Sequence, residues 1–108
     1  MIEKSYSFFN LGCKNIEKLI DDDYLLLNHI VLPKGEGLPE HYSNSNVYII
    51  VIRGSMKLIL DKQEPHLYSC GQIINIPYNT KMSVSNYNED ILEFFVIKSP
   101  NPRNYEGV

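Results

Sequence analysis

The 108-residue sequence is short of positive charge, of cysteine and of long apolar runs, and it has no tryptophan or alanine. Its 10 Lys and Arg residues are outnumbered by 13 Asp and Glu and are scattered along the chain, so no phosphate-binding surface for nucleic acid is expected. The longest apolar run, residues 47–52, is far too short to cross a membrane. The N-terminus lacks the apolar core of a secretory signal, so we expect a cytoplasmic protein. From the charge and the short apolar runs, we expect no nucleic-acid and no membrane partner.

The pattern of the chain predicts a single all-β domain over residues 1–108. Apolar residues make up 44% and charged residues 21% of the sequence, as in ordinary globular proteins, and no repeat interrupts it. Short segments of high β-propensity alternate with Gly, Pro and Asn turns, which favours a small antiparallel barrel or sandwich. The segments are 24–32, 47–52, 56–60, 71–76 and 91–98. A strand or a short helix of barely two turns is expected in the segment 1–23, at residues 13–20, and a tail at 99–108.

Two stretches resemble the paired motifs of the cupin superfamily, whose members fold as small β-barrels of the jelly-roll type. The first motif reads Gly, five residues, His, one residue, His, three or four residues, Glu, six residues, Gly, and it is matched at Gly35, His41 and Gly54. The second motif is matched at Gly71, Pro77 and Asn86. This resemblance covers residues 24–98 and implies a cupin-like barrel.

The resemblance also implies where a metal would be bound. Metal-binding cupins hold a divalent ion with three His and one Glu, and these positions fall on His41, Ser43, Val47 and Met82. Only His41 retains a suitable donor, since a serine hydroxyl is a poor ligand, valine offers none and a thioether suits Cu(I). We therefore expect no metal and no other cofactor, and a metal that did bind would use His41.

Two alternatives for the remaining histidines and cysteines stay open. His29 and His66 could rebuild a three-histidine metal site with His41, although each is more simply read as a polar residue, on a strand flank and on an exposed hairpin respectively. Cys13 and Cys70 lack a CxxC spacing and are expected to be free thiols. A disulfide, or a metal site that they share with His66, is the alternative.

Strand alternation predicts a pocket at the former metal position. The residues expected to line it are His41, Ser43, Val47, Ile49, Met82, Val84 and Asn86. Apolar walls with a few polar groups suit a small organic ligand, so we expect a small-molecule-binding or regulatory module rather than an enzyme, with no catalytic residue assigned. The alternatives are a metal-dependent isomerase or dioxygenase with rearranged ligands, metal-free acid–base chemistry with His41 and a tyrosine, and a structural dimeric module with a filled barrel.

A homodimer is also expected. Residues 47–52 are apolar on both faces of the predicted strand, whereas a strand with one face in the core should alternate with polar residues. Tyr48, Ile50 and Ile52 therefore need cover, from a second copy of the chain or from the N-terminal segment.

Overall fold

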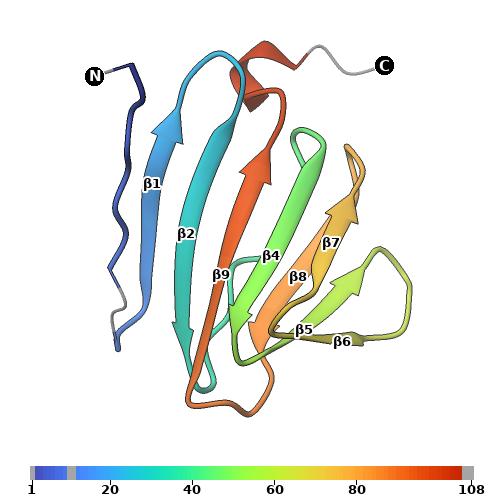
Figure 1. The fold of residues 1–108 in the computed structure, drawn as a ribbon. Helices are drawn as coiled ribbons and strands as arrows, with labels where there is room; N and C mark the ends of the chain where they lie inside the picture. The colour runs from blue at the N-terminus through green and yellow to red at the C-terminus, as the bar shows by residue number, and fades with distance from the viewer. Residues whose placement is uncertain (1, 10–11, 106–108) are drawn as a thin grey trace.

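The computed structural model describes residues 2–9 and 12–105, which form nine β-strands and one short 3₁₀-helix (Figure 1). The first five strands are β1 (Asn15–Asp21), β2 (Leu26–Pro33), β3 (His41–Tyr42), β4 (Val47–Arg53) and β5 (Ser55–Leu60). They are followed by β6 (His66–Ser69), β7 (Ile73–Ile76), β8 (Lys81–Asn86), β9 (Ile91–Lys98) and the helix η1 (Pro102–Asn104). The strand predicted at 91–98 has these bounds, and the segment predicted as a strand or a short helix at 13–20 is the strand β1.

The strands form two antiparallel sheets, one in the order β1-β2-β9-β4-β7 and one in the order β3-β8-β5-β6. Figure 1 shows β1, β2, β9 and β4 lying next to one another in this order, although β9 comes last in the chain. The prediction of an all-β antiparallel jelly roll is confirmed. The division at 1–23, 24–98 and 99–108 stays a prediction, and residues 1, 10–11 and 106–108 lie outside the described residues.

Alternation along the strands decides which side chains enter the core between the sheets. In β4, Val47, Ile49 and Val51 are buried, while Tyr48 and Ile50 point to the outer face. The same rule buries alternate residues of β8. In β9 it buries Leu92, Phe94 and Val96, and Glu93 between them is buried as well. The core therefore consists of the inward rows of both sheets.

Gly54, which ends the first motif, makes the turn from β4 to β5. Its φ of +84° is a conformation that residues with a Cβ atom rarely adopt. A Cβ atom added there would also overlap the carbonyl oxygen of Ile91 on β9. The motif needs glycine at this position for both reasons.

His29 corrects one expectation from the sequence, because it is fully buried on the outer face of the five-stranded sheet rather than on a strand flank. Its Nδ1 lies 2.8 Å from Glu17 Oε1, and its Nε2 lies 2.6 Å from Glu93 Oε2. The ring of Phe8, from the N-terminal segment, packs on His29 at 4.8 Å and on Phe95 at 4.9 Å between ring centroids. The N-terminal segment thus covers part of this face within one chain.

Candidate ligand-binding cavity

A cavity of about 290 Å³ opens between the two sheets at one end of the barrel. Along each strand, some inward side chains line the cavity and the others are packed in the core. In β9, Phe94, Val96 and Lys98 line the cavity, whereas Leu92 does not and is fully buried in the packed core. Met56 on β5, directly opposite Asn86 on β8, likewise does not line the cavity and is packed in the core. The fold therefore has one packed end and one hollow end.

The structure brings most of the predicted pocket residues together around this cavity. Six of them line it: His41, Ser43, Val47, Ile49, Met82 and Val84. They come from β3, β4 and β8 and from the loop after β3, and they include all four positions that correspond to the metal ligands of cupins. Ligand binding by these residues remains a prediction, but their spatial grouping agrees with the register taken from the motifs.

Asn86 is not among the residues that line the cavity. It lies four residues beyond Met82 on the same face of β8, which is about 13 Å away at the usual rise of a strand. Its Nδ2 donates to the carbonyl oxygens of Leu32 at 2.9 Å and Glu89 at 3.0 Å, and its Oδ1 accepts from the Glu89 amide at 3.0 Å. Asn86 therefore fastens the turn after β8 at the packed end.

The hydroxyl of Ser43 is already occupied by the protein. It donates to the carbonyl oxygen of Pro77 at 2.6 Å and accepts from the amide of Thr80 at 2.8 Å, and the residue is buried. The backbone amide of Ser43 also donates to the carbonyl of Thr80 at 2.9 Å. Ser43 thus holds the loop between β7 and β8 in place and contributes little polarity to the cavity.

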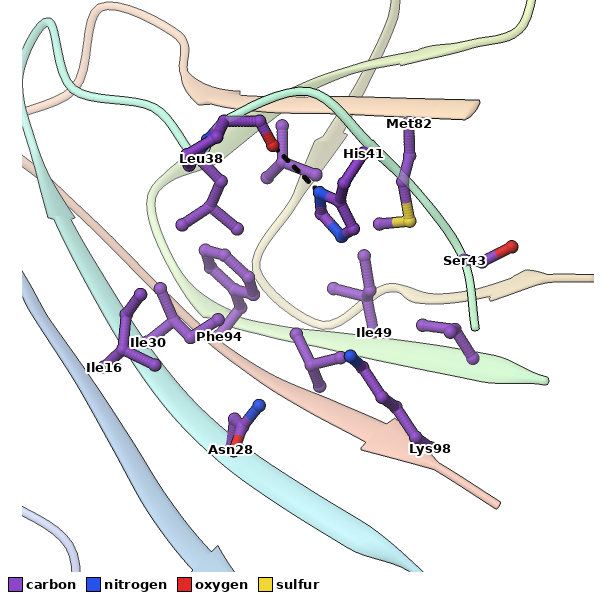
Figure 2. A pocket seen from close by; sticks show the side chains of 14 residues that line it. Ile16, Asn28, Ile30, Leu38, His41, Ser43, Ile49, Met82, Phe94 and Lys98 are labelled. Carbon is purple, nitrogen blue, oxygen red and sulfur yellow. Dashed lines mark hydrogen bonds between the residues drawn. The ribbon is translucent and has the colours of Figure 1, made fainter. Parts of the chain in front are cut away.

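His41 stands at the mouth of the cavity, where it is exposed to solvent. Its Nδ1 lies 2.8 Å from the carbonyl oxygen of Pro39, so Nδ1 carries the hydrogen and donates. In the neutral ring Nε2 then has a free lone pair, and Figure 2 shows this nitrogen pointing toward Ile49. His41 therefore offers the cavity one hydrogen-bond acceptor.

Two polar residues that line the cavity were missed in the sequence, Asn28 on β2 and Lys98 at the end of β9. Burial lowers the pKa of Lys98 below its usual range, and the nearby charge of Lys18 lowers it further. Oδ1 of Asn28 is buried and has no hydrogen-bond partner among residues 2–9 and 12–105. Both residues are polar at positions of β2 and β9 where the alternation predicts an apolar side chain. In the sequence, this departure from the pattern is the signal that could have indicated them.

The residues around the cavity do not fit the metal of the family. Of the four motif positions, His41 alone carries an imidazole, and the nearest possible substitutes lie elsewhere. His29 is on the outer face between two carboxylates, and His66 is exposed at the start of β6. Within residues 2–9 and 12–105, no three His, Cys, Asp or Glu side chains form a group that could hold an ion. Cys13 and Cys70 are free thiols, both exposed.

Comparisons with known proteins agree with this architecture. No family model matches the chain. It is 52% identical over 104 residues to an uncharacterised protein of Methanocaldococcus jannaschii, covering 95% of this chain and 90% of that protein. The crystal structure of that relative, an RmlC-like cupin family protein with a double-stranded β-helix fold, superposes with a TM-score of 0.92 over 95% of each chain. A cupin-like protein of Thermotoga maritima shares the fold at a TM-score of 0.77 and 17% identity, over 87% of this chain and 81% of that one.

Two antiparallel sheets in jelly-roll order, with both motifs meeting at one cavity, define a cupin. Within that class, the chain belongs to the RmlC-like cupin family. No helix in residues 2–9 and 12–105 has the length and apolarity needed to cross a membrane. The relative from Methanocaldococcus is uncharacterised.

Proposed function

We propose that this cupin binds a small organic molecule in its cavity without a metal ion and acts as a binding or regulatory module. The observation that carries the proposal is a cavity of about 290 Å³, walled mainly by apolar side chains, at the position where other cupins hold their metal. Ligand sites in proteins are commonly apolar cavities of roughly 300–1,000 Å³ with a few polar groups that fix orientation. The cavity lies at the small end of this range, which suits a compact ligand.

The two alternatives without a metal find less support. A barrel filled by its own side chains would serve only as a structural module. In this barrel Leu32, Val51 and Leu92 are packed in the core, but the space beyond them is the cavity. Acid–base catalysis with His41 as the base requires an acid on the other side of the substrate. No tyrosine belongs to the described residues that line the cavity, so the acid considered for that reaction is not in place. Binding therefore accounts for the site better than catalysis.

The proposal is tested by filling the cavity. Native mass spectrometry of the purified protein, and a thermal-shift screen of small organic molecules in the presence of EDTA, should identify compounds that bind. Ile49→Phe places a larger side chain at the centre of the cavity wall and should abolish the shift. Ile73→Phe, on the exposed face of β7, is the matched control and should retain it.

Circular dichroism establishes that Ile49→Phe is folded, because a larger side chain in a packed site costs typically 1–3 kcal/mol. If a folded Ile49→Phe protein binds the same compounds with unchanged affinity, they bind elsewhere and the proposal is wrong. The same holds if compounds bind the parent only when EDTA is left out, since the site would then depend on a metal.

A further inference from the structure

Lys98 is a charged side chain in a row of β9 that otherwise faces the core. It is the last residue of β9, in the inward row that continues from Phe94 and Val96, and Figure 2 shows its ammonium group pointing into the cavity. Lys14, Lys18 and Lys81 each lie 3.7 Å from a carboxylate oxygen. Lys98 has no such partner and no hydrogen bond among the described residues. A half-buried cation thus faces an apolar cavity without a counter-charge.

Asn28 lies beside Lys98 on the same inward face. In the antiparallel pair of β2 and β9, Leu26 is opposite Lys98 and Asn28 is opposite Val96, so Asn28 and Lys98 are diagonal neighbours, about 7–8 Å apart at the usual spacing. Figure 2 shows the amide nitrogen of Asn28 directed toward the cavity. Its Oδ1 is buried and has no hydrogen-bond partner within the part of the chain that the structure describes. Two donors therefore converge on one wall.

The charge around these donors is positive. Lys18 on β1 is directly opposite Asn28, and its charge is one of the two causes that lower the pKa of Lys98, after burial. Lys18 is paired with Asp21 at 3.7 Å, on the exposed side. An anion at Lys98 would supply the missing counter-charge and relieve the repulsion between the two lysines, which a neutral ligand would not do.

We propose that the ligand is a small organic carboxylate with an apolar body, whose carboxylate is bound by Lys98 and Asn28; this inference rests on the proposed function. One ammonium group and one amide match the single charge and two oxygens of a carboxylate, whereas a phosphate dianion would keep an uncompensated charge in an apolar cavity. Ile49, Phe94 and Met82 contact the apolar body. Nε2 of His41, at the mouth, accepts a hydrogen bond from a hydroxyl group at the far end of a ligand that carries one.

The experiment compares matched carboxylates and neutral compounds by calorimetry and thermal shift. The probes are butyrate, hexanoate and benzoate, with butanol, hexanol and benzyl alcohol as neutral counterparts, and inorganic phosphate as a second anion. Hydrogen bonds to charged groups contribute enough for a change of about tenfold or more in affinity. We expect the best carboxylate to bind the parent at least tenfold more tightly than its alcohol, and phosphate to bind at least tenfold more weakly than that carboxylate.

Lys98→Met should remove this preference, and Asn28→Leu should reduce it, while the affinity for the alcohol stays within a few fold. Lys34→Met, which removes an exposed lysine and changes the net charge equally, should leave the preference intact. If alcohols bind as tightly as carboxylates, or if Lys98→Met keeps the preference, the anion inference is wrong and the cavity still binds neutral molecules. If no probe of either series binds and native mass spectrometry finds no retained molecule, the proposed function fails as well.

Discussion

His41 on β3 lies directly opposite Met82 on β8, and both side chains line the cavity. Directly opposite residues of an antiparallel pair point to the same side of the sheet, so this pairing brings the two cupin motifs to one place. Ser43 and Val47 line the same cavity. The four side chains at the ligand positions of the family thus surround one space, although only one of them is a ligand for common divalent metals.

A metal site should therefore be recoverable by substitution at the other three positions. The variant Ser43→His with Val47→Glu and Met82→His restores three imidazoles and one carboxylate around the cavity. Without metal it should be less stable than the parent, because Ser43 loses its bonds to the β7–β8 loop and a buried carboxylate lacks a partner. Binding of Ni²⁺ or Mn²⁺ at about 1,000 times the dissociation constant contributes roughly 4 kcal/mol. At about 4–8 °C per kcal/mol, the melting temperature should rise by on the order of 15 °C or more.

The same triple variant with His41→Ala is the control, and the rise should be much smaller there. The parent should show no rise, and EDTA should leave its melting temperature unchanged. A folded triple variant that neither binds metal by calorimetry nor gains stability from it would show that the four side chains do not converge as the structure places them.

Replacing Lys98 should stabilise the protein in the absence of a ligand. The pKa of Lys98 in the folded state lies below its ordinary value of 10.5, so the folded state holds the charged form at a cost. Between the lowered pKa and 10.5 the unfolded chain binds more protons than the folded protein, and stability therefore rises with pH in that window. Lys98→Met removes the cost, so its advantage in urea unfolding should be greatest at neutral pH and should shrink as the pH approaches 10.5.

Lys34→Met makes the same change in net charge at an exposed lysine and is the control. An advantage of Lys98→Met that is equal at pH 7 and pH 10 would contradict the expected cause, since a pure packing gain does not depend on protonation.

Gly54→Ala should lower the free energy of unfolding by about 1–3 kcal/mol or more. Alanine would be strained at the positive φ of this position, and its Cβ atom would overlap the carbonyl oxygen of Ile91. Gly35→Ala is a matched control, since Gly35 has a φ of +83° and no heavy atom near an added Cβ. The difference between the two variants in urea unfolding isolates the overlap with Ile91. Equal losses would mean that the turn after β4 moves aside at no cost.

His29→Leu should be strongly destabilising, by about 3–5 kcal/mol, because it leaves the buried carboxylate of Glu93 without its partner. Adding Glu93→Leu should recover part of this loss, since the carboxylate is then no longer present. Urea unfolding of the two variants measures the recovery. A double variant that is less stable than His29→Leu would show that Glu93 has another role on this face.

The predicted homodimer is tested on the outer face of β4 and β7. Ile50 is directly opposite Ile73, which is 67% exposed, and Tyr48 on the same face is 40% exposed. Covering these side chains with a second copy removes apolar area from water. Light scattering at micromolar concentration should give the mass of a dimer, and Ile50→Glu should give that of a monomer. A parent that scatters as a monomer would contradict the prediction.

The sequence predicts this fold well and this site in part. Alternation within a strand is a local property, so the inward side chains of β4 and β8 follow from their spacing alone. The position of Lys98 at the cavity depends on the pairing of β9 between β2 and β4, which joins distant parts of the chain. The burial of His29 likewise depends on Phe8, which reaches it from outside the strands. Asn86 shares the inward face of β8 but does not line the cavity, because alternation gives the face of a residue and not its position along the barrel.

The hydrogen bonds of Ser43 have a consequence for how this family member can change. A histidine at position 43 would remove both side-chain hydrogen bonds that anchor the loop between β7 and β8. Of the three substitutions that would rebuild the metal site, this one therefore carries a loss of stability at whatever point it is made. A metal site would be built at a smaller loss of stability if that loop were first fastened in another way and the substitution at position 43 were made last.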